Sequence, residues 1–294
     1  MQRVLITGGT GFIGRAVVDA LRGRGDEPIA VSRSAQPPAV TWDAVEREVE
    51  RADAVVHLAG EPIAEGRWTP RRLERIRSSR VESTKRIAAA IQGASRKPRV
   101  FVSGSAVGIY GMRDDDKELD ESAPAGEDVL AKIVVAWEAA AEAARSVGVR
   151  VVHPRTGVVL GRGGGALPKM AAPFRWFVGG TPGDGRQWVS WVHLHDVVRA
   201  LLFAVDNKAL TGPVNVVAPT PVTMETLTRC IGRALNRPAI MRVPPFALRV
   251  ALGEGLAQML LTGQRALPRK LRDAGFTFDF PGVEEACADL LQRV

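Results

Sequence analysis

Short apolar runs alternate with longer segments of helical spacing along the first 220 residues. The runs that predict strands are Arg3–Ile6, Pro28–Val31, Ala54–Leu58, Arg99–Ser103, Arg150–His153 and Pro213–Val217. The segments that predict helices between them are Phe12–Arg22, Pro70–Ile91, Glu127–Ser146 and Leu194–Asp206. Such alternation is typical of βαβ units, and strands apolar on both faces need helices on both sides. The pattern therefore predicts an α/β fold with a doubly wound parallel sheet.

The pattern changes in the second half of the chain. Gly161–Gly185 is rich in glycine and proline and predicts a long loop over the carboxyl ends of the strands. Three helical segments follow Thr220, namely Met224–Leu235, Pro245–Leu261 and Val283–Leu291. We therefore expect a sheet domain over 1–220 and a small, mainly helical subdomain over 221–294.

A glycine-rich turn joins the first strand to the first helix. Residues 7–14 read T-G-G-T-G-F-I-G, so Gly9, Gly11 and Gly14 form the pattern G-x-G-x-x-G. In this context the first glycine allows a tight turn, Gly11 admits a pyrophosphate to the helix N-terminus, and Gly14 lets the helix pack closely on the strand. The turn predicts a dinucleotide site on a Rossmann sheet.

The end of the second strand bears on the choice of dinucleotide. Ser32 and Arg33 follow that strand, where a protein that binds NAD normally carries an acid for the ribose hydroxyl. A hydroxyl and a guanidinium suit a 2′-phosphate instead. We therefore expect NADP(H), the alternative being that Arg33 is only a surface charge. Small residues after His57 suggest that its backbone forms a cofactor wall.

Composition limits the class of protein. With 294 residues, 46% of them hydrophobic, the chain can bury a large core. Its two cysteines, Cys230 and Cys287, lie far apart in sequence and near no ligand-like residue, which favours a reducing compartment and no metal site. Met1 leads almost directly into the first strand, and no apolar stretch approaches the ~20 residues that span a bilayer. We expect a soluble cytoplasmic protein with no membrane partner.

The chain carries a net charge of +8, and arginine supplies most of its positive charges. The densest basic cluster, on the helix predicted over Pro70–Ile91 and just before it, comprises Arg67, Arg71, Arg72, Arg75, Arg77 and Arg80. Only one aromatic residue, Trp68, lies within it, whereas several interleave with the basic residues of many nucleic-acid sites. We interpret it as a solvated helix face, with a nucleotide-phosphate contact from one or two of these arginines as the alternative. A nucleic-acid partner is not expected.

Several segments together resemble the extended short-chain dehydrogenase/reductase superfamily. They are T-G-G-T-G-F-I-G at 7–14, H-L-A-G at 57–60, S-G-S-A-V-G-I-Y-G at 103–111, R-T-G-V-V-L-G at 155–161, W-V-H-L-H-D at 191–196 and G-P-V-N-V-V-A-P at 212–219. The chain is most similar to an atypical branch of NAD-dependent epimerase/dehydratase-like "epimerase family" proteins, some of them named cell-division-inhibitor-like. Marks of that branch are S-R at 32–33, S-S-R-V-E-S-T at 78–84, W-E at 137–138, G-D-G-R-Q-W-V-S-W at 183–191 and L-L-T-G-Q-R at 260–265. The last of these belongs to a C-terminal domain of unknown function.

The resemblance implies a role for particular residues. The pyrophosphate would lie against Gly8, Gly9, Thr10, Gly11, Phe12, Ile13 and Gly14. Ser32 and Arg33 would hold the 2′-phosphate, while Leu58, Ala59 and Gly60 would line the adenosine and ribose path. Arg80 and backbone near Val159 would contact the cofactor, and Ser103 and Ser105 would lie beside the nicotinamide.

One part of the superfamily pattern is missing. The resemblance implies a tyrosine and, four residues later, a lysine on the helix after the fifth strand, and Leu130 and Val134 occupy those places here. The one tyrosine, Tyr110, lies in the preceding loop, and Lys132 is about 200° around the helix from the tyrosine place. Ser105 and Tyr110 remain as catalytic candidates, the alternatives being a structural serine and a packed loop tyrosine.

Polar and aromatic residues of a later segment suit an anionic or planar substrate. They are Arg186, Gln187, Trp188 and Trp191. Packing of the loop, with tryptophan as a core anchor, is an equally good interpretation. Asp196 is interpreted as a helix-capping residue.

The sequence thus favours an NADP(H)-binding atypical reductase or epimerase-like oxidoreductase with an unknown small substrate, as a monomer or homodimer. In that hypothesis Ser105 polarises a substrate carbonyl and Tyr110 or water completes proton transfer. The rival is a non-catalytic NADP(H)-binding sensor or scaffold that acts through a protein partner, for example in cell division.

Overall fold

The computed structural model describes residues 1–33 and 39–292, and its centre is a parallel sheet. The strands follow one another in space as β14 (Gly212–Val216), β8 (Arg150–Thr156), β5 (Val100–Ser103), β4 (Ala54–His57), β1 (Arg3–Thr7), β2 (Glu27–Ser32) and β3 (Val40–Thr41). A short strand, β6 (Ser105–Ala106), pairs with the end of β8. Because the chain runs outward from β1 to β3 and then returns to β4, the order reverses between β1 and β4. Ligands of such sheets bind at that reversal, beyond the carboxyl ends of the strands.

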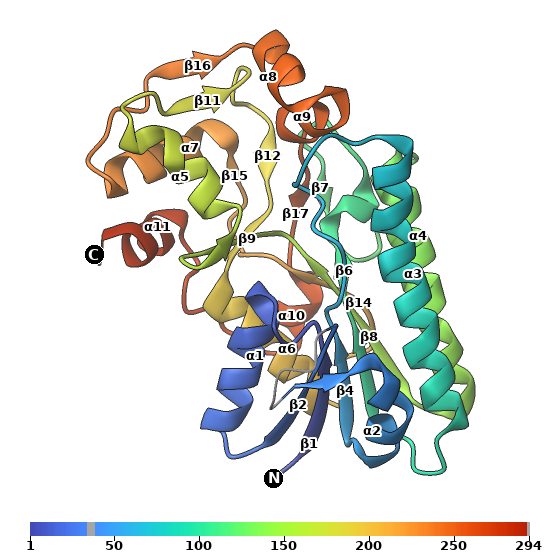
Figure 1. Ribbon diagram of the computed structural model, residues 1–294. Helices are drawn as coiled ribbons and strands as arrows, with labels where there is room; N and C mark the ends of the chain where they lie inside the picture. The colour runs from blue at the N-terminus through green and yellow to red at the C-terminus, as the bar shows by residue number, and fades with distance from the viewer. Residues whose placement is uncertain (34–38, 293–294) are drawn as a thin grey trace.

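Helices cover both faces of the sheet (Figure 1). Helices α1 (Phe12–Gly23) and α6 (Leu194–Asp206) cover one face; α2 (Val45–Arg51), α3 (Pro70–Gly93) and α4 (Val129–Glu142) cover the other. Alternate strand residues supply the two cores: Val4 and Ile6 pack with α1 and α6, whereas Leu5 packs with the second set. This alternation follows from the two-residue period of a strand. The predicted doubly wound α/β fold is confirmed.

A second, smaller apolar core lies beyond the carboxyl edge of the sheet. Strands β9 (Val158–Gly161), β12 (Trp188–Val189), β13 (Trp191–His193) and β15 (Val222–Thr223) contribute to it. β10 (Gly164–Gly165) pairs with β9, and β11 (Gly180–Pro182) pairs with β16 (Met241–Val243). Helices α5 (Leu167–Arg175), α7 (Met224–Ala234) and α11 (Val283–Gln292) contribute to this core, whereas α8 (Pro245–Leu252) and α9 (Glu254–Leu261) lie outside it. The remaining elements are β7 (Glu118–Leu119), which pairs with β17 (Arg265–Ala266), α10 (Arg269–Asp273) and three short 3₁₀ turns. The helical character predicted for the C-terminal region is confirmed.

Two sequence interpretations need correction here. The predicted loop Gly161–Gly185 contains helix α5, whose Pro168 lies in the first turn, where a helix tolerates proline. The predicted helix Pro245–Leu261 is two helices, because Gly253 between them has φ +83°. The boundary at residue 220 stays a prediction, although the small core includes residues from both sides of it, such as Trp191 and Leu227.

Candidate functional site

The glycine-rich turn lies at the reversal point of the sheet, between the ends of β1 and β4. Gly8 has φ +71°, and a Cβ there would lie 2.9 Å from the backbone of Leu58 and Ala59. A Cβ on Gly14 would lie 2.1 Å from the carbonyl oxygen of Gly8. The turn can therefore approach β4 and the first turn of α1 only because both positions lack a side chain.

The N-terminus of α1 has the features of an anion site. Its N-cap is Gly11, which supplies no side-chain acceptor, and its first turn contains no acidic residue. Gly11 N–H donates to Gly8 O at 2.9 Å, which shapes the turn, and Thr10 and Gly11 are exposed. The positive end of the helix is therefore not neutralised by a carboxylate of its own first turn.

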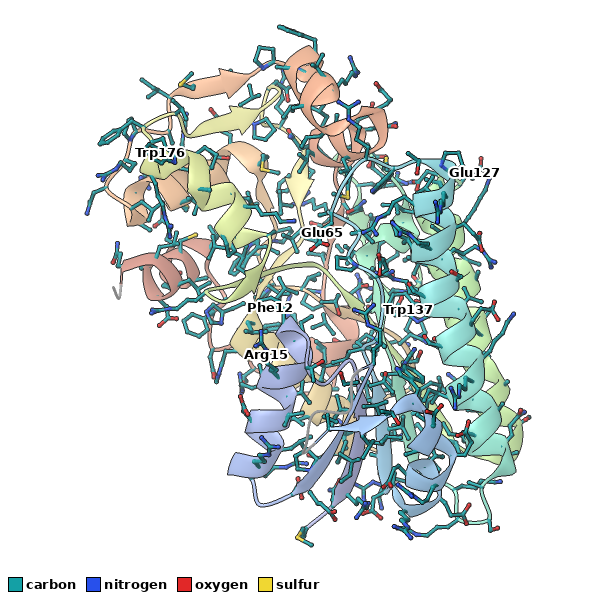
Figure 2. The ribbon with its side chains drawn as sticks, in the orientation of Figure 1. Phe12, Arg15, Glu65, Glu127, Trp137 and Trp176 are labelled. Atoms are coloured by element: carbon teal, nitrogen blue, oxygen red, sulfur yellow. The ribbon has the colours of Figure 1, made fainter. Side chains whose placement is uncertain are left out.

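Phe12 uses its ring for packing. A Cβ on Gly161, Gly164 or Gly165 would lie 2.5–2.8 Å from atoms of that ring. These glycines therefore make room for the ring of Phe12, which lies at the start of α1 (Figure 2). The half-buried Val159 belongs to the same segment, and a Cβ on Gly165 would lie 2.7 Å from its carbonyl oxygen.

Ser32 and Arg33 lie at the carboxyl end of β2, next to the glycine turn. A Cβ on Gly9 would lie 2.7 Å from the Cβ of Ala30, so the turn rests directly on this strand. Ser32 is half-buried in register with Thr41 of β3, and Arg33 is exposed. The guanidinium is thus available at the edge where a ribose phosphate would be expected.

Arg80 lies against the end of β4 from the other side. Its guanidinium donates to the carbonyl of Glu61 at 2.9 Å and lies 5.2 Å from the ring centroid of Trp137. A Cβ on Gly60 would lie 3.2 Å from Cζ of Arg80. Burial lowers the pKa of Arg80 to about 10, so a poorly solvated positive charge adjoins the predicted adenosine and ribose path.

His57 is a structural residue. Its Nδ1 lies 2.5 Å from Oγ1 of Thr7, and its Nε2 lies 3.1 Å from Oγ of Ser83. Burial, with a smaller repulsion from Arg80, lowers its pKa to about 3. The ring is therefore neutral and joins β1 to α3, in agreement with the expectation that only its backbone forms a wall.

Two buried donors at the end of β5 have no hydrogen-bond partner within the described residues. They are Oγ of Ser103 and Nε1 of Trp137. Both adjoin Gly104, since Ser103 precedes it and a Cβ on Gly104 would lie 3.0 Å from the Trp137 ring. Buried donors are almost always paired, so these two are available for hydrogen bonds to a bound molecule.

Ser105 begins a buried chain of polar groups. Its hydroxyl donates to Oε1 of Glu138 at 2.6 Å, and Arg155 donates to both oxygens of that carboxylate at 2.9 and 3.0 Å. Arg155 also donates to the Tyr110 hydroxyl at 3.1 Å, which in turn donates to Oδ1 of Asn215 at 2.7 Å. Although burial opposes its charge, the hydrogen bonds from Arg155 to Glu138 and the attraction between them raise the pKa of Arg155 above its usual range.

The network unites the two catalytic candidates and gives them different surroundings. Tyr110 is only 1% exposed, and burial raises its pKa, so its hydroxyl is a structural partner of Arg155 in this geometry. Leu130 is half-buried and Val134 is buried, whereas Lys132 is exposed and faces away. Catalytic roles for Ser105 and Tyr110 stay predictions, and Ser105 alone has a proton-accepting neighbour.

The side chains of the four substrate candidates have different surroundings. Trp191 is fully buried in the small core and donates from Nε1 to the carbonyl of Thr220 at 3.0 Å. The Gln187 amide donates to two backbone carbonyls, and Arg186 is exposed and pairs with Asp184 at 3.2 Å. Trp188 is half-buried and donates to Asp116 at 2.7 Å. The packing interpretation accounts for Trp191 and Gln187, and a substrate role for the set remains untested.

Asp196 does not cap its own helix. Its carboxylate accepts the backbone N–H groups of Asp279 and Phe280 at 3.0 and 2.9 Å, whereas His193 caps α6. The capping interpretation was wrong because the sequence does not reveal which distant segment crosses the start of α6.

Sequence reasoning did not assign a role to the Glu138–Arg155 pair. Glu138 follows Trp137 on α4, and Arg155 lies on β8, which also contains Arg150 and His153. The local sequence therefore does not distinguish these two charges from others, and their pairing follows only from the packing of α4 against β8.

Among residues 1–33 and 39–292, every helix is too short or too polar to cross a bilayer. The described residues likewise hold no cluster of three or more histidine, cysteine or acidic side chains suited to a metal.

Comparisons with known proteins agree with this geometry. Residues 4–217 match the NAD dependent epimerase/dehydratase family, and residues 243–290 match a domain of unknown function, DUF1731. Epimerase family protein YfhF of Bacillus subtilis (strain 168) is 38% identical over 300 residues, which cover 99% of this chain and 98% of that protein.

Two solved structures extend the likeness to three dimensions. Human epimerase family protein SDR39U1 (isoform 2), crystallised with NADPH, has a TM-score of 0.93 at 36% identity and covers 99% of this chain and 100% of its own. A nucleoside-diphosphate sugar epimerase from Corynebacterium glutamicum has a TM-score of 0.82 at 32% identity, covering 99% of this chain and 58% of its own. The resemblance inferred from the sequence is confirmed, and the chain belongs to the NAD dependent epimerase/dehydratase family.

Proposed function

We propose that this protein binds NADP(H) and uses it in an oxidoreductase or epimerase-like reaction on a small hydroxyl- or carbonyl-bearing substrate. The observation that carries the proposal is the side-chain-free cradle formed by Gly8, Gly11 and Gly14 at the start of α1. Human SDR39U1, which is 36% identical, was solved with NADPH.

The residues of the site fit a phosphorylated dinucleotide. The pyrophosphate would lie on the glycine turn, and Ser32 with the exposed Arg33 would hold the 2′-phosphate. Residues 32–41 include no carboxylate that would repel this phosphate. The orphaned donors of Ser103 and Trp137 supply unused hydrogen bonds at the end of β5.

We assign the proton transfer of this reaction to Ser105 and Glu138. A bound nicotinamide supplies a hydride acceptor or donor. In the direction of alcohol oxidation, Ser105 Oγ accepts the proton of the substrate hydroxyl while its own proton passes to Glu138, 2.6 Å away. In the reverse direction the same two protons return, and the Ser105 hydroxyl protonates the reduced oxygen. Arg155 holds the Glu138 carboxylate in place, and Tyr110 positions Arg155.

Calorimetric titration with NADPH and NADH tests the cofactor. We expect NADPH to bind at least about tenfold more tightly, and Arg33→Asp to remove that preference because a charge-assisted bond to phosphate is lost. Arg22→Gln, at the far end of α1 beside Asp19, is the matched control and leaves both affinities unchanged. Tighter binding of NADH to the unmodified protein contradicts the proposal.

Turnover separates an enzyme from a sensor. NADPH absorbance is followed with a panel of aldehydes and ketones, and Ser105→Ala is expected to slow turnover about 10²-fold without weakening NADPH binding. Tight NADPH binding with no turnover on any compound favours the non-catalytic sensor, which the missing tyrosine–lysine pair also favours. Turnover unchanged in Ser105→Ala removes the role given to this residue.

A further inference from the structure

β11, β16 and α8 lie at the end of the molecule opposite the N-terminus (Figure 1), and large exposed apolar side chains are concentrated on and next to these elements. We name them the apolar edge: Trp176, Phe177, Val178, Ile240, Met241, Phe246 and Val250. Trp176 is 79% exposed and Ile240 is 86% exposed. Elsewhere in the described chain, large exposed apolar residues occur only as Met1, Val129 and Val135. Exposed apolar groups concentrated in this way mark an interaction surface.

Strand pairing makes the edge continuous. β11 and β16 run parallel with Gly180 opposite Met241, so the segment after α5 lies beside Ile240 and Met241. The Arg237 guanidinium lies 4.3 Å from the ring centroid of Phe177, which joins the two segments again. Phe246 and Val250, four residues apart on α8, continue the edge directly after β16.

Trp176 and Phe177, which we name the aromatic tip, follow α5 and are exposed. Phe174 is 2% exposed and anchors the end of α5, with Gly179 so close that a Cβ there would lie 2.3 Å from its ring. Between these two anchors, Phe177 has φ +60°, a backbone conformation that bulky side chains rarely adopt. Figure 2 shows Trp176 at this tip, far from Phe12 and Trp137. A turn that holds such a conformation presents its rings to solvent in one fixed direction.

The edge is also cationic. Residues 163–183 and 226–253 contain seven basic residues and no acidic one. Glu225 and Glu254, which directly adjoin the second segment, and Glu284 neutralise part of this charge by pairing with Arg229, Arg233, Arg242 and Arg249. Within the described part of the chain, Arg175 and Arg237, which flank the aromatic tip, form no ion pair with a carboxylate. Two such edges would repel each other, so the charge selects an anionic partner over a second copy of this chain.

We propose that the apolar edge docks on an anionic lipid bilayer, with its aromatic and aliphatic side chains in the interface and Arg175 and Arg237 at the headgroups. Tryptophan and phenylalanine favour this interface, and arginine is attracted to anionic lipid. Val178, Ile240, Met241 and Val250 gain nothing from stacking on bases, which favours lipid over single-stranded nucleic acid. This contact lies on the surface, crosses no membrane, and differs from the sequence expectation of no membrane partner.

Vesicle sedimentation of the full chain tests the proposal. The probes are vesicles of phosphatidylcholine alone and vesicles with about one third phosphatidylglycerol, at ~0.05 and ~0.5 M salt. We expect binding to the anionic vesicles at low salt, with affinity reduced at least about tenfold in the triple variant Trp176→Ala/Ile240→Ala/Phe246→Ala, which removes apolar area. Arg175→Gln/Arg237→Gln is expected to weaken binding about tenfold, whereas the matched surface variant Val129→Ala/Val135→Ala binds as the unmodified protein does.

Three outcomes overturn the proposal. The first is no binding of the unmodified protein to anionic vesicles at low salt. The second is unchanged binding by the triple variant, which would assign the contact to another surface. The third is binding to polyuridylate with none to vesicles, which would identify the partner as nucleic acid. Unchanged NADPH affinity and circular dichroism of the triple variant show that it has folded, and the result does not depend on the proposed catalytic function.

Discussion

The hydroxyl of Ser105 donates a 2.6 Å hydrogen bond to Oε1 of Glu138. Glu138 would otherwise be a costly buried charge, and Arg155 compensates it with two further hydrogen bonds. The candidate proton-transfer pair is therefore also a structural unit of the core between α4 and β8.

Replacement of Arg155 tests this dual role. Arg155→Met leaves the Glu138 carboxylate without its partner, so we expect a loss of about 3–5 kcal/mol in the free energy of unfolding. Urea denaturation measures the loss. Arg186→Met, at an 87% exposed side chain paired with Asp184, should change stability by less than about 0.5 kcal/mol. A loss at Arg155 no larger than at Arg186 would show that the pair is not needed for stability.

The glycines of α1 offer a second test within one helix. In Gly14→Ala the new methyl group would lie 2.1 Å from Gly8 O, so the turn must move and NADPH binding should fall at least about tenfold. Gly23 lies at the other end of α1 with no atom within 4 Å of its Cβ position. Gly23→Ala should therefore bind NADPH normally and be as stable as the unmodified protein, or up to about 1 kcal/mol more stable. Equal behaviour of both variants in calorimetry would contradict the close approach.

Trp137→Phe removes the indole N–H donor and keeps an aromatic ring at this position. Nε1 has no hydrogen-bond partner among the residues that the structure describes, so its removal should leave the unfolding free energy within about 1 kcal/mol. If this donor binds the dinucleotide, NADPH affinity falls about fivefold. Unchanged affinity would assign the orphaned group to the protein core.

His57 predicts how stability depends on pH. The pKa of His57 is about 3 in the folded chain, whereas its ordinary value is 6.5. Between these two values the imidazole is protonated in the unfolded chain and neutral in the folded chain. Stability should fall as pH drops below 6.5, by up to about 1.4 kcal/mol per pH unit from this residue alone. Burial also lowers the pKa of His193, which adds to the slope.

Urea titrations between pH 7 and 5 compare the unmodified protein with His57→Asn. The slope should diminish in this variant and persist in His195→Gln, which alters a half-exposed surface ring. An unaltered slope in His57→Asn would show that this ring does not control the pH dependence.

The two cysteines should be inert in the folded protein. Burial raises the pKa of Cys287 to about 12 and also raises that of Cys230. The thiolate is the reactive form, so native protein at pH 8 should resist a thiol reagent that labels both residues in urea. Rapid labelling of the native protein would indicate that α7 and α11 separate readily.

The local hydrophobic pattern was sufficient to predict the strands of the sheet but not the elements of the small core. The six predicted strands lie within a few residues of β1, β2, β4, β5, β8 and β14, because each is apolar and bounded by turn residues. Helix α5 was hidden by Pro168 and Pro173. The stacking of Phe12 on Gly161–Gly165 joins segments about 150 residues apart, and no local spacing encodes such a contact.

For the candidate site, the glycine turn and Arg33 could be located from sequence since their roles depend on neighbours in the chain. The polar network could not, because Ser105, Glu138 and Arg155 meet only when β6, α4 and β8 assemble. Trp191 illustrates the converse, in which a residue chosen for its chemistry proved to be a core anchor.

The pairing of β17 with β7 joins the C-terminal region to the preceding part of the chain. Gly263 exchanges backbone hydrogen bonds with Arg113, and Ser190 Oγ both donates to Gln264 and accepts from Ala266. The C-terminal stretch is thus hydrogen-bonded to loops that belong to the nucleotide-binding half. Truncation before residue 243 would remove the hydrogen-bond partners of Arg113 and Ser190, so we expect the two regions to unfold together and the shortened chain to be less stable.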